Sequence, residues 1–202
     1  VEGAVEPRIL DIEPGGRAII ELRAIGSETC GLSINIPYKV ESGEESSEGH
    51  LLSLAVPRLI PGRVTYAVNS REEIILLAAP SYTAVIRLRG ASVLIRGLDD
   101  ESMAYLSTEG IGPPFWPNEL ERKTFHYDIE EEGSALTVKL WTSIDKLGGA
   151  KIIKKLIFRP SPPHVEVSYE LTNPGEALLE GELAINGWIP GWSWTAPSAS
   201  RE

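Results

Sequence analysis

Alternation of apolar and polar residues in short segments is the dominant pattern along this chain, and it predicts β-strands. The pattern is most regular in the second half, where turns rich in Gly, Pro and Asn separate five such segments: residues 123–129, 135–144, 150–158, 165–171 and 177–185. Short turns of this kind join antiparallel strands, whereas parallel strands need long crossovers that are usually helical. The second half is therefore predicted to be an antiparallel meander or Greek key.

The first half shows the same alternation in shorter segments. Strands are expected at residues 9–12, 17–25, 32–40, 64–68, 73–78, 83–88 and 91–95. Residues 41–49 contain no apolar side chain and are expected to form an exposed acidic loop. Residues 99–107 begin with acidic side chains and are the only candidate for a helical turn, although a strand fits them nearly as well. We therefore predict an all-β protein, an antiparallel β-sandwich with little or no helix.

Length and composition agree with one soluble globular domain. The 202 residues suit a single β-sandwich domain, and residues 60–63 are the candidate internal boundary because they combine Pro and Gly. No apolar run approaches the about 20 residues that a membrane-spanning helix needs. The first residues lack the features of a signal peptide, so none is expected in this sequence. Gln is absent while Glu and Arg are plentiful, a trend of thermophilic proteins, so high thermal stability is expected.

Charge and the scarcity of reactive side chains exclude several classes of function. A formal net charge of -10 makes this an acidic protein and disfavours nucleic acid or an anionic membrane as partner. The lone Cys30 allows no intrachain disulfide and is expected to be a small buried residue. The histidines at positions 50, 126 and 164 are scattered and match neither a metal site nor a nucleophilic triad. No cofactor and no metal are expected.

Two loops rich in aromatic residues, Pro and Gly, residues 110–119 and 186–194, remain as candidate ligand sites. Pro and Gly hold such loops in preset shapes, which lowers the ordering cost when aromatic rings meet a ligand. The apolar C–H face of a sugar stacks on indole while carboxylates and amides take its hydroxyl groups. The candidate ligand-binding residues are Phe115, Trp116, Asn118, Glu119, His126, Asn186, Trp188, Trp192 and Trp194. The alternative is that these aromatic side chains close the ends of a sandwich or meet another domain.

Several segments resemble the galactose-mutarotase-like β-supersandwich of aldose epimerases and of non-catalytic domains in glycoside hydrolases. The matching strings are G-P-P-F-W-P-N-E at 112–119, L-T-V-K-L-W-T-S at 136–143, I-I-K-K-L-I-F-R at 152–159 and V-E-V-S-Y-E-L-T-N-P-G-E at 165–176. The family's acid histidine is replaced by Asn186-Gly187-Trp188, and the later segment that would carry its carboxylate base is not in this sequence. The resemblance therefore implies a binding or accessory domain rather than a catalytic epimerase.

Two functions follow from these observations. The first is a carbohydrate-binding or accessory β-sandwich domain linked to glycan processing, with an oligosaccharide as partner and no catalysis of its own. The alternative is a structural or assembly module of a larger multidomain or surface protein, whose tryptophans meet another domain or a second copy. An enzyme that uses Glu119 and His126 as an acid/base pair ranks third, and it would be carbohydrate-active, of epimerase or glycosidase type.

Overall fold

The computed structural model describes residues 31–42, 45–98, 102–176 and 180–188. Its strands are β1 Gly31–Ser42, β2 Glu45–Pro57, β3 Thr65–Asn69, β4 Ile74–Ala78, β5 Tyr82–Arg87, β6 Val93–Gly97, β7 Met103–Leu106, β8 Gly110–Gly112, β9 His126–Glu132, β10 Ala135–Ile144, β11 Ala150–Pro160, β12 Pro163–Thr172, β13 Glu182–Ala184 and β14 Gly187–Trp188. The helical elements among the described residues are two short 3-10 turns, η1 Glu119–Arg122 and η2 Asp145–Leu147. The protein is therefore all-β, as the alternating pattern predicts.

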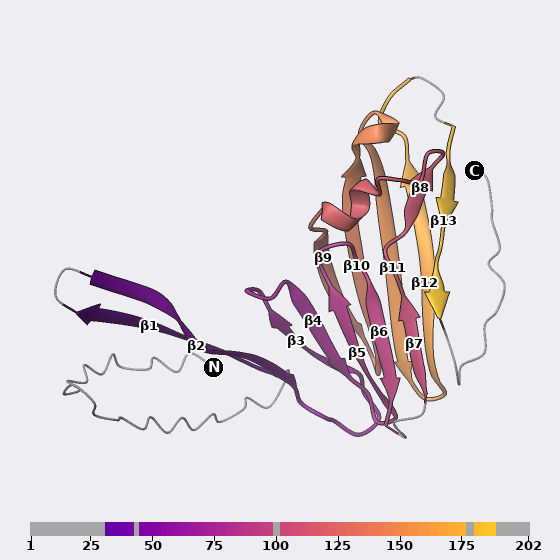
Figure 1. Ribbon diagram of the computed structural model, residues 1–202. Coiled ribbons are helices and arrows are strands. Elements are labelled where there is room, and N and C mark those ends of the chain that lie inside the picture. The colour runs from indigo at the N-terminus through magenta and orange to yellow at the C-terminus, as the bar shows by residue number, and fades with distance from the viewer. Residues whose placement is uncertain (1–30, 43–44, 99–101, 177–179, 189–202) are drawn as a thin grey trace.

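Two antiparallel sheets form the body of the molecule (Figure 1). One sheet has six strands in the order β14-β7-β6-β5-β4-β3, and the other has four in the order β12-β11-β10-β9. The short pair β13-β8 lies near the end of the sandwich where η1 and η2 are found. The chain passes directly from one hairpin to the next through β9, β10, β11 and β12, so the predicted second-half meander is confirmed for these four strands. The strand expected at residues 177–185 does not continue it, because β13 pairs with β8.

The hydrophobic core lies between the two large sheets. Strands such as β5 and β6 bury every second residue, and this burial accounts for the alternation of apolar and polar residues in the sequence. Inward residues with no exposed surface include Ile75, Ile86 and Val93 from one sheet and Leu136, Val138, Leu140, Ile152, Leu156 and Phe158 from the other. A core of this size stabilises the fold without disulfide bonds.

Strands β1 and β2 form a long hairpin that extends away from the sandwich, and residues 58–64 connect it to β3 (Figure 1). The predicted acidic loop at residues 41–49 is wrong for its described part. Residues 45–49 belong to β2 and pair with β1, from Ser42 opposite Glu45 to Tyr38 opposite Gly49. A hairpin that projects from the body needs no apolar face, so polar residues such as Ser46 and Glu48 form strand there and stay exposed.

The candidate helical turn at residues 99–107 is also wrong for its described part. Residues Met103–Leu106 form β7, in which Ala104 and Leu106 are buried and Tyr105 is exposed. This burial has a period of two residues, which a strand satisfies and a helix does not. The strands expected at residues 9–12 and 17–25 lie outside the described residues. None of the helical elements among the described residues is long and apolar enough to cross a bilayer.

Candidate functional site

The aromatic loop after β8 folds back onto its own strand. A side chain at Gly112 would lie 2.7 Å from the ring of Phe115, and one at Gly110 would lie 3.3 Å from it. These two glycines thus leave the space into which the Phe115 ring packs. The neighbouring Trp116 is 75% exposed. Phe115 keeps 39% of its surface exposed, so Trp116 is the more exposed of the two adjacent aromatic side chains.

Asn118 serves the structure of this loop. Its Oδ1 accepts a hydrogen bond from the backbone N–H of Leu120 (3.2 Å), which caps the start of η1. Its Nδ2 donates to the carbonyl oxygen of Glu109 (2.9 Å). Both ends of the amide are therefore engaged within the protein.

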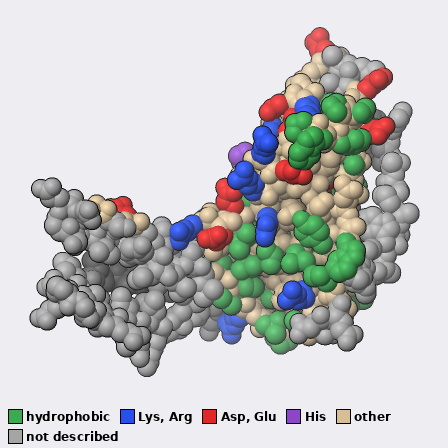
Figure 2. Space-filling view, in the orientation of Figure 1, with side chains coloured by type: hydrophobic (Ala, Val, Ile, Leu, Met, Phe, Trp, Pro, Cys, Tyr) green, Lys and Arg blue, Asp and Glu red, His purple; other side chains and the backbone are tan. Residues whose placement is uncertain are grey.

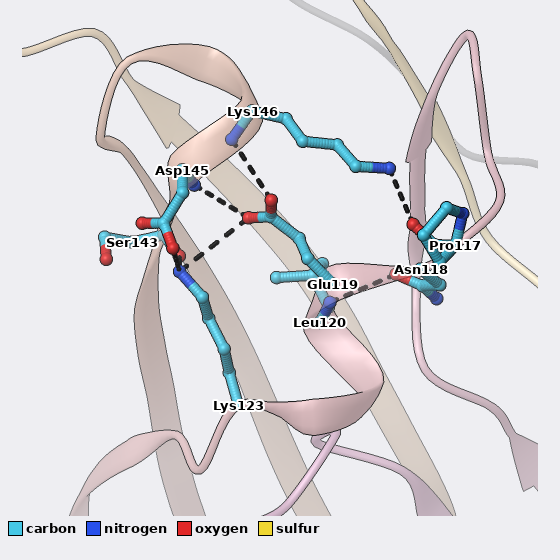
Figure 3. A network of polar contacts seen from close by, with 8 residues as sticks. All are labelled: Pro117, Asn118, Glu119, Leu120, Lys123, Ser143, Asp145 and Lys146. Carbon is cyan, nitrogen blue, oxygen red and sulfur yellow. Dashed lines mark hydrogen bonds and ion pairs between the residues drawn. The ribbon is translucent and has the colours of Figure 1, made fainter.

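Glu119 joins the aromatic loop to the β10–β11 connection (Figure 3). Its carboxylate accepts hydrogen bonds from the backbone N–H groups of Asp145 (2.7 Å) and Lys146 (3.1 Å), the first residues of η2. A carboxylate at this position satisfies N–H groups that a helical turn leaves unpaired. The carboxylate proposed to bind sugar hydroxyl groups is thus occupied by backbone donors.

Two lysines complete the same network (Figure 3). The ammonium group of Lys123 lies 2.9 Å from Asp145 Oδ2 and 3.7 Å from Glu119 Oε1, and it donates to the carbonyl of Ser143 (2.7 Å). The ammonium group of Lys146 donates to the carbonyl of Pro117 (2.6 Å). These contacts tie the Pro-rich loop to the four-stranded sheet, so this region is built as a structural junction.

The second aromatic loop is described as far as Trp188. The carbonyl of Asn186 accepts a hydrogen bond from the Ser107 N–H (2.9 Å), and the Asn186 side chain is exposed. Trp188 lies directly opposite Tyr105 in the β14–β7 pair, with 56% and 41% of their surfaces exposed. Trp192 and Trp194 lie outside the described residues.

The described aromatic residues of the two loops pack against different strand pairs. Phe115 packs beside the pair Gly110–Ala184, whereas Trp188 pairs with Tyr105.

His126 lies elsewhere, on the outer face of the four-stranded sheet. It is exposed at the start of β9 and stacks on Trp141 of β10, with ring centroids 5.8 Å apart and planes inclined by 27°. The ammonium group of Lys151 lies 5.6 Å from the centre of the Trp141 ring. An indole in this setting is a stacking surface bordered by polar groups.

A shallow pocket adjoins this stack on the same face. Trp141 lies opposite Ile153, and Ile153 lies opposite Glu170. Ile153 and Glu170 both line the pocket, so the pocket begins in the same cross-strand row as the indole of Trp141. The lining residues are Asp128, Glu130, Thr137, Lys139, Ile153, Lys155, Ser168, Tyr169 and Glu170. Carboxylates accept hydrogen bonds and ammonium groups donate them, so the pocket offers both kinds of partner to a ligand rich in hydroxyl groups. We call this surface, with His126 and Trp141, the polar face.

Sequence reasoning found His126 but missed the rest of the polar face. The alternation in L-T-V-K-L-W-T-S places Thr137, Lys139 and Trp141 on the same side of β10, which could have indicated the face. The neighbours of Lys139 depend on register: Asp128 lies opposite on β9 and Lys155 on β11. Register is set by the packed fold and cannot be read from one strand.

A second, partly exposed surface crosses the outer face of the six-stranded sheet. Register aligns one outward residue from each of five neighbouring strands in a row: Leu76, Val85, Leu94, Tyr105 and Trp188. We call this row the apolar band. Figure 2 shows hydrophobic side chains gathered over these strands. Arg87 and Arg96 are exposed two positions to either side of the row.

No family model, curated protein or solved structure matches this chain. Among the described residues, no group of three or more His, Cys, Asp and Glu side chains could hold a metal ion.

Proposed function

We propose that this chain is a carbohydrate-binding or accessory β-sandwich domain without catalysis of its own, and that the polar face is its ligand surface. The observation that carries the proposal is a pocket lined by both carboxylates and ammonium groups that begins in the same cross-strand row as the indole of Trp141. A sugar presents a ring face of C–H groups and a rim of hydroxyl groups. An aromatic ring beside mixed donors and acceptors matches both parts.

The strand arrangement supports preorganised binding. The row of Asp128, Lys139, Lys155 and Ser168 crosses four hydrogen-bonded strands, so the backbone positions of these groups are fixed by the sheet. Side chains held on a rigid scaffold lose less freedom on binding than side chains on loops. Lys151 lies over the indole, and a bound sugar ring would take its place.

Isothermal titration calorimetry with a panel of oligosaccharides tests this function. We expect binding by the wild-type protein, loss of that binding in Trp141→Ala, and unchanged binding in Trp116→Ala. Trp116 is the matched control because it is an exposed tryptophan that does not line the pocket. Absence of binding to every glycan, or loss of binding in the Trp116 variant with retention in the Trp141 variant, would refute the proposal.

A structural or assembly module is the second candidate, and the apolar band favours it. The band is a straight row, so it is complementary to itself when two copies related by a twofold axis pack face to face. Sheets packed in this way lie about 10 Å apart and would cover the row on both copies. Arg87 and Arg96 would remain at the rim, where they reach solvent. The occupant that we propose is therefore a second copy of this chain.

Light scattering of the purified protein measures its oligomeric state directly. We expect a dimer that Leu94→Glu dissociates, because a carboxylate would then be buried at the centre of the interface. Thr83→Glu is the control, since Thr83 is exposed on the same sheet face outside the apolar band. A wild-type protein that is monomeric at high concentration would rule out this assembly.

A further inference from the structure

A lysine and a glutamate meet inside the hydrophobic core. The side chains of Lys154 and Glu109 are 0% and 1% exposed, and Lys154 Nζ lies 2.6 Å from Glu109 Oε1. Charged side chains are rarely buried this completely, because removing them from water costs more free energy than pairing returns. The pair takes no part in either exposed surface, so it needs an explanation of its own.

The pair bridges the two layers of the sandwich. Lys154 is an inward residue of β11, between Ile152 and Leu156, which have no exposed surface. Glu109 comes from the segment between β7, on the edge side of the six-stranded sheet, and β8. A covalent bond here would tie residues that lie 45 positions apart in the chain.

The hydrogen bonds around the pair are unevenly distributed. Glu109 Oε1 accepts from Lys154 Nζ and also from the hydroxyl of Tyr169, each at 2.6 Å. Lys154 Nζ donates in addition to the carbonyl of Ala91 (2.9 Å). Glu109 Oε2 is buried and has no hydrogen-bond partner among the described residues. One carboxyl oxygen is thus held by donors while the other is left without any.

The apolar surroundings favour the uncharged form of the Lys154 amine. Burial lowers the pKa of Lys154 through desolvation, while the nearby Glu109 carboxylate acts in the opposite direction. Moving the proton from the ammonium group to the unpartnered carboxyl oxygen removes two charges from an apolar interior. The reactive form of the pair would be a free amine in hydrogen-bond contact with a carboxylic acid.

We propose that Lys154 and Glu109 condense to an amide, an intramolecular crosslink between the two layers. The Lys154 nitrogen lone pair forms a bond with the Glu109 carboxyl carbon, and Oε1 gains negative charge in the tetrahedral intermediate. The bond from that carbon to Oε2 then breaks. Oε2 leaves as water, with the acid proton that it carried and one proton from the amine. The reaction needs no oxidant, reductant or co-reactant.

The surrounding groups suit each part of this reaction. The hydroxyl of Tyr169 donates to Oε1, where negative charge develops, and stabilises it as an oxyanion donor does. The Ala91 carbonyl orients the amine by accepting one of its protons. The packed core holds the Lys154 amine beside the Glu109 carboxyl group. Folding has therefore already brought the two reacting groups together, and the reaction itself does not carry that entropy loss. Tyr169 is a positioning and oxyanion-stabilising residue for this step.

Intact-mass spectrometry of the denatured full chain tests the crosslink. We expect a mass lower than that of the sequence by one water, and proteolysis should release a branched peptide that joins residues 109 and 154. Lys154→Met should show no mass deficit. Tyr169→Phe should contain a measurable uncrosslinked fraction, because the oxyanion donor is lost while the ring remains.

The wild-type measurement alone decides the proposal, so it stands even if a variant fails to fold. A folded wild-type protein whose mass equals that of the sequence would show that Lys154 and Glu109 form only a buried ion pair. A water deficit located on other residues would overturn the assignment equally.

Discussion

The imidazole of His126 stacks on the indole of Trp141 across neighbouring strands, with ring centroids 5.8 Å apart. The two residues lie directly opposite each other in the β9–β10 pair, so the contact is set by strand register. His126 therefore contributes to a stacking surface that neither residue forms alone. This relationship moves the candidate ligand site from the Pro-rich loops to a sheet face.

Replacing His126 by Ala should weaken oligosaccharide binding without unfolding the protein. The ring is exposed, so the free energy of unfolding should change by no more than about 0.5 kcal/mol. Loss of the stacked partner should reduce binding free energy by about 1 kcal/mol. Calorimetry on the variant, with His164→Ala as control, measures the effect. Equal weakening by both substitutions would show that the His126–Trp141 stack is not part of the ligand surface.

Replacing Glu119 by Ala should destabilise the fold. The carboxylate accepts from the N–H groups of Asp145 and Lys146, and their loss resembles the removal of a helix cap. We expect a decrease of about 1 to 2 kcal/mol in the free energy of unfolding, measured by urea denaturation. Glu121→Ala, an exposed residue of the same 3-10 turn, is the matched control and should be nearly neutral. Equal midpoints for the two variants would contradict a capping role.

Replacing Gly112 by Ala should displace the Phe115 ring. The added methyl group would lie 2.7 Å from ring atoms, closer than carbon atoms can approach. We expect a loss of about 1 to 3 kcal/mol, the usual range for overpacking. The loss should shrink in a Phe115→Ala background, because the clashing ring is gone. Additive effects in this double-mutant cycle would show that the two residues do not interact.

The fold could be predicted from the sequence further than the site could. The alternation of apolar and polar residues along Ala135–Ile144 predicted the bounds of β10. This works because side chains along a strand alternate between the core and the outer face with the same period of two residues. The pairing of Lys154 with Glu109 could not be found in this way, since it depends on how the two layers pack. The same holds for Trp141, whose partners come from strand register. Glu119 was expected in a loop but begins the 3-10 turn η1, and its backbone partner Asp145 lies 26 residues away, so it left no local signal.

Replacing Glu166 by Gln should remove a small component of stability that depends on pH. Arg159 donates to its carboxylate (2.9 Å) and His164 lies 3.0 Å from it, and the hydrogen bond from Arg159 is the main reason that the pKa of Glu166 falls below its ordinary value of 4.5. A lowered folded-state pKa means that this stabilisation is complete above the ordinary value and is lost as pH falls through the folded-state pKa. Because the groups are exposed, the free energy of unfolding of the wild-type protein should exceed that of the variant by less than about 1 kcal/mol at neutral pH.

Urea denaturation of both proteins at neutral and at acidic pH measures this difference. It should be present at pH 7 and shrink toward zero once Glu166 is protonated in both the folded and the unfolded state. Added salt should reduce the neutral-pH difference, since screening weakens exposed ion pairs. A difference that persists unchanged in acid would mean that Glu166 stabilises β12 through packing of its side chain and not through charge.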